Sequence, residues 1–147
     1  MIYALFIGAF AYGFKKIKLF KLVHLEPKTC FSIIVPFRNE ATNLPQLLHS
    51  FSQLDYPREK FEILFVNDSS EDNSVETINQ FPVSSFSFRI IDTIRTSNSP
   101  KKDAIDTAIK LINNDWVVTT DADCYVNSDW LKVYDAYIQE HNPEMVA

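Results

Sequence analysis

Glycine is nearly absent from this 147-residue chain. Its two glycines, Gly8 and Gly13, both lie in the apolar N-terminal segment, so residues 31–147 contain none. Dinucleotide-binding fingerprints and Walker-type phosphate loops need glycine, because their backbone must approach a phosphate closely. The sequence therefore excludes both motifs. If the chain binds a phosphorylated ligand, another group must meet the negative charge, and a divalent cation held by carboxylates would do so.

Cysteine, histidine and clustered basic residues are scarce as well. Cys30 and Cys124 are too few for a disulfide framework, which favours a reducing compartment, and no cysteine or histidine has zinc-site spacing. Residues 1–30 hold five lysines and one glutamate, a net charge of +4, whereas the rest hold nine basic and eighteen acidic residues, a net charge of −9. Because nucleic-acid binding needs clustered Lys and Arg, we expect no nucleic-acid partner.

The N-terminal segment is apolar. Residues 1–14 carry no charged side chain, and lysines follow at positions 15, 16, 18 and 21. A cleaved signal peptide has its charges before the apolar run, so this segment is not one. A fourteen-residue helix covers about 21 Å, less than the ~30 Å hydrocarbon core of a bilayer. The segment is either a terminal helix packed on the protein or a membrane anchor whose lysines face the cytoplasm. We favour an anchor over residues 1–22 and a linker over 23–30, which places the rest on the cytoplasmic side of the cell membrane.

Strands and helices alternate over residues 31–147. Apolar runs rich in β-branched and aromatic residues predict strands at 30–36, 61–67, 88–93 and 116–120. Helical spacing of apolar residues, with Ser, Thr, Asn, Asp or Pro near each start, predicts helices at 42–54, 72–80, 99–114 and 128–140. This alternation predicts an α/β fold with a mainly parallel sheet and flanking helices.

Polar residues follow three of the four expected strands. Arg38 and Glu40 follow the first, Asp68 the second, and Asp121 and Asp123 the fourth. Ligands of parallel α/β sheets bind outside the carboxyl ends of the strands, so we expect these side chains in one crevice. Asp121 and Asp123 are one residue apart and point the same way, where their charges repel unless a cation lies between them. Mg²⁺ or Mn²⁺, which prefer oxygen ligands, would relieve that repulsion.

Simpler interpretations remain open for several of these residues. Asp68 could do no more than cap the helix that follows it. Arg38 and Glu40 could pair with each other on the surface. Two lysines at positions 101 and 102 begin an expected helix, where the helix dipole disfavours cations, and they could be a solvated pair.

Four segments together resemble a known family: "VPFRNE" (35–40), "VNDSSEDNS" (66–74), "PKKDAIDTA" (100–108) and "TTDADC" (119–124). Their order and spacing are similar to those of the inverting nucleotide-sugar glycosyltransferases with the Rossmann-like GT-A fold, which include cellulose, chitin and hyaluronan synthases. The resemblance covers about residues 31–147. It implies that Pro36, Arg38 and Glu40 border the nucleoside and that Asp68 accepts a hydrogen bond from a uracil-type base. It also implies that Lys101 or Lys102 lies near the diphosphate or sugar. Asp121 and Asp123 would form a DxD pair, with Asp123 as the firmer metal ligand.

The resemblance also implies a function in polysaccharide biosynthesis. The expected reaction is metal-dependent transfer of a sugar from a nucleotide diphosphate sugar to a hydroxyl of a saccharide or lipid-linked acceptor. We expect the donor to be UDP-linked and the reaction to take place at the cytoplasmic face of the membrane. In the family the catalytic base, an Asp or Glu, comes well after the DxD strand. We therefore expect the base beyond Ala147 and expect this chain, as the N-terminal part, to bind the donor without transferring sugar.

The chain departs from the family pattern in two motifs. Asn67 and Ser69 flank Asp68 where members often have Asp and Gly, and Pro100 stands where the lysine helix commonly begins with Gly. These departures leave the sugar open. Two other functions remain as alternatives. The first is a nucleotidyltransferase, which usually needs a Gly-rich phosphate loop that is absent here. The second is a non-catalytic, membrane-tethered nucleotide-binding or receiver-like module, and a receiver-like module would need an acidic pair after the first strand.

Overall fold

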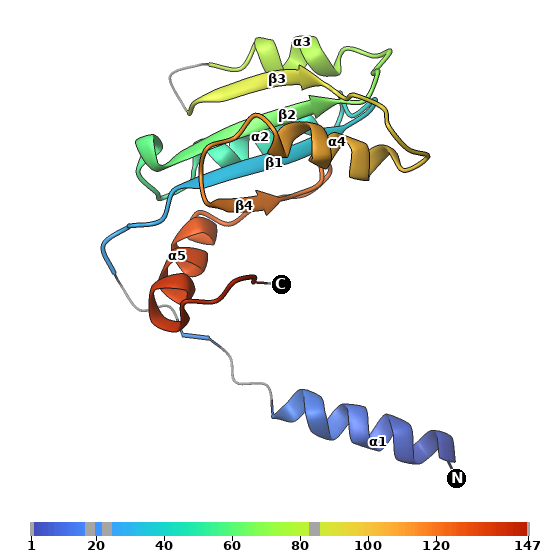
Figure 1. Cartoon of the computed structure of the whole chain (residues 1–147), viewed down its shortest axis with the longest axis vertical. Helices are drawn as coiled ribbons and strands as arrows, with labels where there is room; N and C mark the ends of the chain where they lie inside the picture. Colours follow the sequence, from blue (N-terminus) through green and yellow to red (C-terminus); the bar gives the residue numbers. More distant parts are fainter. Residues whose placement is uncertain (1, 17–19, 22–24, 83–85, 147) are drawn as a thin grey trace.

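The computed structural model describes residues 2–16, 20–21, 25–82 and 86–146. Its centre is a four-stranded sheet in the order β3-β2-β1-β4, in which every neighbouring pair is parallel (Figure 1). The strands are β1 (Phe31–Phe37), β2 (Phe61–Asn67), β3 (Phe88–Asp92) and β4 (Trp116–Thr119). The helices are α1 (Ile2–Lys15), α2 (Leu44–Ser52), the 3₁₀ turn η1 (Arg58–Lys60), α3 (Ser74–Asn79), α4 (Pro100–Ile109) and α5 (Trp130–His141). The predicted parallel α/β sheet is confirmed.

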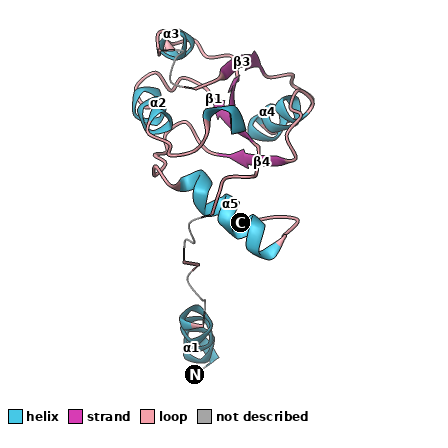
Figure 2. Ribbon diagram, turned by 90° about the vertical axis from the view of Figure 1, so that its left-hand side faces the viewer, coloured by secondary structure: helices cyan, strands magenta, loops and turns pink. Residues whose placement is uncertain are grey.

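Helices cover both faces of the sheet, with α2 and α3 on one face and α4 on the other (Figure 2). Side chains of a strand alternate between the two faces, so Ile33 and Val35 pack toward α2, whereas Ile34 packs against Ala104 and Ala108 of α4. Both central strands are therefore buried on both faces, which explains their continuous apolar sequences. Burial of each large side chain of this kind contributes about 1.5–3 kcal/mol to stability.

The order of the strands locates the ligand-binding edge. From β1 the chain proceeds outward to β2 and β3, and it then returns through α4 to place β4 on the other side of β1. The order in which strands are added to the sheet thus reverses between β1 and β4, although the two strands are parallel. In open parallel sheets, ligands bind at such a reversal, outside the carboxyl ends of the strands.

All four helices predicted over residues 31–147 differ from their predicted extents, and α4, which ends five residues early, differs most. The helix predicted over 99–114 ends at Ile109, and Asn114 instead donates its side-chain amide to the Phe31 carbonyl and the Ser32 hydroxyl of β1. The last helix begins at Trp130, so Asp129 and not Ser128 occupies its N-cap position, and the Ser128 carbonyl accepts the backbone N–H of Asp55.

The N-terminal helix α1 lies apart from the α/β domain in Figure 1, and each of its side chains that the structure describes is exposed. In the described part of the chain, no helix has the length and apolar character needed to cross a bilayer. Lys18 and Leu22 of the expected anchor, and residues 23–24 of the expected linker, lie outside the described residues. The later part of the linker is fixed to the domain, since buried Asp135 of α5 accepts the backbone N–H of Thr29 at 3.0 Å and its hydroxyl at 2.6 Å.

Candidate functional site

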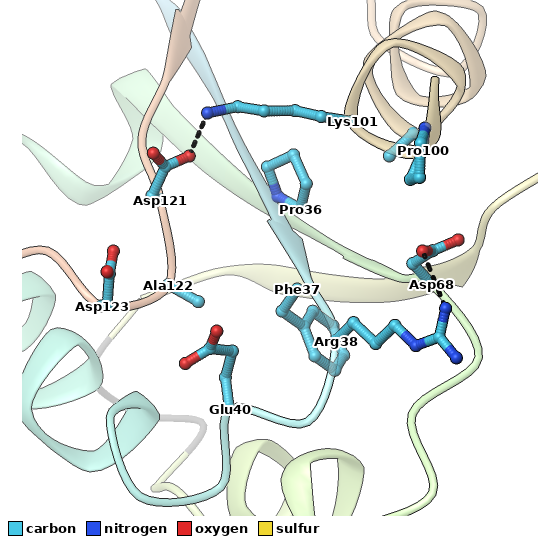
Figure 3. A pocket seen from close by; sticks show the side chains of 11 residues that line it. Pro36, Phe37, Arg38, Glu40, Asp68, Pro100, Lys101, Asp121, Ala122 and Asp123 are labelled. Carbon is cyan, nitrogen blue, oxygen red and sulfur yellow. Dashed lines mark hydrogen bonds and ion pairs between the residues drawn. The ribbon is translucent and has the colours of Figure 1, made fainter. Parts of the chain in front are cut away.

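A pocket of about 340 Å³ lies at the carboxyl edge of the sheet (Figure 3). Four segments that are far apart in the sequence line it: the end of β1 and its loop, the end of β2, the start of α4, and the loop after β4. The lining residues are Pro36, Phe37, Arg38, Glu40, Asp68, Pro100, Lys101, Ala104, Asp121, Ala122 and Asp123. Of the predicted site residues, Lys102 does not line the pocket; its side chain is exposed one position further along α4.

Two loops at the pocket are held together without glycine. Asn39 and Ser69 have positive φ angles of 56° and 59°, a left-handed conformation that costs a non-glycine residue about 1–2 kcal/mol. Hydrogen bonds between the loops offset this cost. The backbone N–H of Asn39 donates to the Ser70 hydroxyl at 3.1 Å, and the backbone N–H of Glu71 donates to the Asn39 side-chain oxygen at 2.8 Å. The loops after β1 and β2 are therefore positioned before any ligand binds.

Asp68 lies at the end of β2, and its side chain is only 9% exposed. Its backbone N–H donates to the Phe37 carbonyl at 2.9 Å, which continues the pairing of β2 with β1. One carboxylate oxygen, Oδ2, accepts a hydrogen bond from Arg95 at 2.7 Å, while the other, Oδ1, is buried without a partner among the described residues. Asp68 is not a helix cap, because α3 begins only at Ser74.

Arg38 and Glu40 do not pair with each other. Arg38 extends toward Asp68 and lies 4.0 Å from its Oδ2 (Figure 3). Glu40 accepts a hydrogen bond from the Asn43 side-chain amide at 2.6 Å, and its backbone N–H donates to the Ser74 hydroxyl at 2.8 Å. The surface-pair interpretation is therefore wrong. Asn43, which occupies the N-cap position of α2, makes no capping hydrogen bond with its side chain.

The two aspartates of the loop after β4 have different surroundings. Lys101 of α4 donates to Asp121 at 2.5 Å, so an ammonium group meets the charge of that carboxylate. Asp123 is exposed and, in the part of the chain described, forms no ion pair. Both lysines are exposed, but Lys101 contacts an acidic residue of the pocket.

The donor set at this edge suits a magnesium or manganese ion. No group of three or more His, Cys, Asp or Glu side chains among the described residues could hold a metal alone. Asp121 and Asp123 line the same pocket, however, and Mg²⁺ usually binds one or two carboxylates together with substrate phosphates and water. The residues present therefore fit a cation whose remaining ligands come from a bound diphosphate.

The sequence analysis missed two residues that contact the site or its loops, Arg95 and Asp103. Arg95 follows the third expected strand, just as polar residues follow the other three. Its position after a strand was therefore the feature of the sequence that could have indicated a residue at the edge of the sheet. Asp103 is fully buried in the first turn of α4, where Thr96 and Ser97 each donate a backbone N–H and a hydroxyl to its carboxylate at 2.8–3.1 Å. Burial raises the pKa of Asp103, but these hydrogen bonds outweigh burial and hold the pKa well below its usual range.

Acidic residues after Asp123 stay out of the pocket. None of Asp129, Asp135, Glu140 and Glu144 lines it. Asp135 is buried beneath the linker, and Glu144 lies near the outer edge of β4. Within the described residues, the pocket thus has the buried carboxylate of Asp68 at one end and the charged side chains of Lys101, Asp121 and Asp123 at the other.

Known proteins resemble this chain in sequence. Residues 32–147 match the family "Glycosyl transferase family 2". Over 116 residues the chain is 28% identical to the poly(ribitol-phosphate) β-N-acetylglucosaminyltransferase TarS of Staphylococcus aureus, covering 79% of this chain and 20% of that protein. It is 33% identical over 101 residues to an undecaprenyl-phosphate 4-deoxy-4-formamido-L-arabinose transferase of Pseudomonas fluorescens, covering 66% and 28%. The chain thus spans about a fifth to a quarter of the length of these relatives.

Solved structures share the fold. S. aureus TarS 1–349 in complex with UDP-GlcNAc matches with a TM-score of 0.69 at 29% identity, covering 77% of this chain and 32% of that chain. The mannosyltransferase PcManGT of Pyrobaculum calidifontis, in complex with GDP-Man and Mn²⁺, matches with a TM-score of 0.73 at 22% identity, covering 91% and 39%. The second likeness concerns the fold alone. Together these matches confirm the GT-A architecture.

Proposed function

Since this chain belongs to glycosyl transferase family 2, we propose that its pocket binds the nucleotide diphosphate of a sugar donor, UDP-linked, for transfer of the sugar to an acceptor hydroxyl. One observation carries the proposal: four distant segments bring Asp68, Lys101, Asp121 and Asp123 into one pocket at the carboxyl edge of the sheet. The complex of TarS with UDP-GlcNAc, a protein 29% identical over the matched region, supports a UDP-linked donor.

In this proposal, each end of the pocket binds one part of the donor. Pro36, Arg38 and Glu40 border the nucleoside, and Asp68 accepts a hydrogen bond from its base. Lys101 binds the diphosphate, and Asp121 and Asp123 hold Mg²⁺ or Mn²⁺ against it. When bound there, the cation supplies neutralisation of charge on the leaving diphosphate.

Transfer also requires a base that takes the proton from the acceptor hydroxyl. No described acidic residue after Asp123 lines the pocket, so this proposal assigns the base to none of them. The acceptor is a saccharide or a lipid-linked molecule. Relatives whose names specify poly(ribitol-phosphate) and undecaprenyl-phosphate support an acceptor of this class and a function in polysaccharide biosynthesis.

The alternative functions have less support. A nucleotidyltransferase would share the parallel sheet, but residues 31–147 contain no glycine for its phosphate loop. A receiver-like module would need an acidic pair after β1, where Arg38 and Asn39 stand.

Binding of UDP by the whole chain tests the proposal. In calorimetry we expect UDP to bind with Mn²⁺ and to bind at least roughly tenfold more weakly in EDTA, because Asp121 and Asp123 then face the diphosphate with no metal ion between them. Asp123→Ala should show the same loss in the presence of Mn²⁺. Asp129→Ala, which changes an exposed acid outside the pocket, serves as the control and should bind as the wild type does. Equal affinity with and without metal would contradict the metal-dependent site.

We also propose that α1 anchors the chain to the cell membrane, with the α/β domain on the cytoplasmic side. Support comes from the side chains of Leu5, Phe6 and Phe10, which are 61–73% exposed, and from Lys15 and Lys16 immediately after them. Exposed apolar residues next to lysines suit insertion into a bilayer with anionic headgroups on the lysine side.

Washing of membranes from expressing cells tests this anchor. We expect the chain to remain in the membrane fraction after high salt and after carbonate, because the contact with lipid is apolar. Phe10→Asp should shift the chain toward the carbonate supernatant. Complete release of the wild type by salt alone would show a surface association instead.

A further inference from the structure

Arg95 of the β3–α4 loop contacts Asp68, which lines one end of the pocket. Its Nη2 atom donates to Asp68 Oδ2 at 2.7 Å, and Arg38 Nη1 lies 4.0 Å from the same oxygen. The two arginine side chains are 41% and 52% exposed, whereas that of Asp68 is 9% exposed. A buried carboxylate thus meets solvent-facing guanidinium groups on one oxygen only.

The other oxygen of Asp68 leaves hydrogen-bonding capacity unused. An ionised carboxylate accepts about four hydrogen bonds, and Asp68 Oδ1 receives none from the described residues. Buried acceptors without a partner are rare in folded proteins and call for an explanation, such as a ligand. Arg95 holds Oδ2 in place and so fixes the rotation of the carboxylate. In that rotation, Oδ1 remains free to accept a hydrogen bond from a ligand.

We propose that Arg95 is a positioning residue, which orients Asp68 so that the site accepts nucleobases with an imide N–H and disfavours those without one. This inference rests on the proposed donor site. An ionised carboxylate can only accept hydrogen bonds. Uracil N3 and guanine N1 carry a hydrogen to donate, whereas cytosine N3 and adenine N1 present a lone pair. A site that needs a donor rejects an analogue lacking it, because the buried acceptor is then left unpaired.

The chain offers a matched control for the Arg95–Asp68 pair. Arg89 of β3 pairs with Glu62 of β2 at 3.0 Å, again an arginine joining the same two neighbouring segments. That pair lies near the amino end of β2, and neither residue lines the pocket. Its side chains are 49% and 26% exposed, so it has the charges of the Arg95–Asp68 pair without its burial or its place at the site.

The test compares affinities for UDP, CDP and pyrophosphate, each with Mn²⁺, by calorimetry on the 147-residue chain. We expect the wild type to prefer UDP over CDP. Arg95→Met should weaken UDP by about tenfold and bring the UDP-to-CDP ratio close to one, with pyrophosphate affinity unchanged. Arg95→Lys should recover part of the preference, and Arg89→Met should leave all three affinities unchanged. Melting curves without ligand show which variants remain folded, and the ratio is read on folded protein.

Three results would overturn the inference. An unchanged UDP-to-CDP ratio in Arg95→Met would show that Asp68 keeps its orientation without Arg95. An equal loss of UDP and pyrophosphate would show that Arg95 acts only through its charge. Failure of the wild type to bind any of the three ligands would contradict the proposed donor site itself, and the inference with it.

Discussion

Lys101 and Asp121 form an ion pair in the pocket, and both side chains are more than half exposed. An exposed pair of this kind contributes only about 0–1 kcal/mol, so ligands can displace either partner. A diphosphate competes for Lys101, whereas a cation competes for Asp121. The pair therefore opposes binding of a metal ion alone and favours joint binding of cation and diphosphate, which offers a new partner to both residues.

Replacing Lys101 should accordingly change two affinities in opposite directions. In Lys101→Met we expect Mn²⁺ alone to bind roughly threefold more tightly, because Asp121 loses a competing cation. The same variant should bind UDP with Mn²⁺ roughly tenfold more weakly, because a charge-assisted contact to the diphosphate is lost. Electron paramagnetic resonance measures free Mn²⁺, and calorimetry measures UDP.

Lys102→Met is the matched control for this prediction, since Lys102 is adjacent and exposed outside the pocket. It should leave both affinities as in the wild type. A fall in Mn²⁺ affinity in Lys101→Met would show that the lysine does not compete with the cation.

The sequence predicted the acidic residues of the site better than their partners. Asp68, Asp121 and Asp123 directly follow apolar runs, so the strand pattern alone placed them at one edge of the sheet. Arg95 comes three residues after the end of β3, in a loop without periodicity. Its pairing with Asp68 depends on how two loops fold over the sheet edge, which no local pattern specifies.

At the scale of elements, the β3–α4 loop depends on one buried carboxylate. Asp103 accepts hydrogen bonds from the backbone and hydroxyl groups of Thr96 and Ser97, and these residues directly follow Arg95. The loop that carries Arg95 is thereby tied to the first turn of α4, which carries Lys101. One residue thus positions contacts at both ends of the pocket.

Asp103 should make stability depend on pH in the acid range. Its hydrogen bonds hold the pKa in the folded chain below the value of about 3.9 for an unfolded Asp. The stabilisation is therefore complete above pH ~4 and is lost as the pH falls below that value. We expect Asp103→Asn to melt at a lower temperature than the wild type at pH 7 and to lose less further stability between pH 5 and pH 3.

Thermal unfolding followed by circular dichroism across this pH range measures the difference. Asp106→Asn, on the same helix, controls for the loss of one carboxylate and should follow the wild-type curve. Parallel curves for Asp103→Asn and the wild type would contradict the assigned role of Asp103.

Strands were predictable to within about one residue, whereas helix ends were not. Burial on both faces imposes continuous apolar runs on β1 and β2, and such runs have sharp limits in the sequence. The ends of α4 and α5 are set by contacts of Asn114 and Ser128 with distant segments. The helix propensities of the residues do not predict such long-range contacts.

At the scale of the whole molecule, the α/β domain and the apolar helix α1 are joined by a linker whose end is fixed. Asp135 binds the backbone of Lys28 and Thr29, and Tyr56 donates its hydroxyl to the Thr29 carbonyl at 2.7 Å. Burial and the nearby Asp135 raise the pKa of Tyr56, so its hydroxyl stays a donor at neutral pH. β1 begins at Phe31, two residues after Thr29. These contacts of Thr29 therefore give the end of the linker a defined position relative to the sheet.

The central claim is that one pocket binds the base of a nucleotide at Asp68 and its diphosphate at Asp121 and Asp123. A crystal structure of the chain with UDP and Mn²⁺, with anomalous data at the manganese edge, tests it most directly. The account predicts an anomalous peak within coordination distance of Asp123 and the diphosphate, with the uracil ring against Asp68. A manganese peak away from both aspartates, or a nucleotide bound outside this pocket, would contradict it.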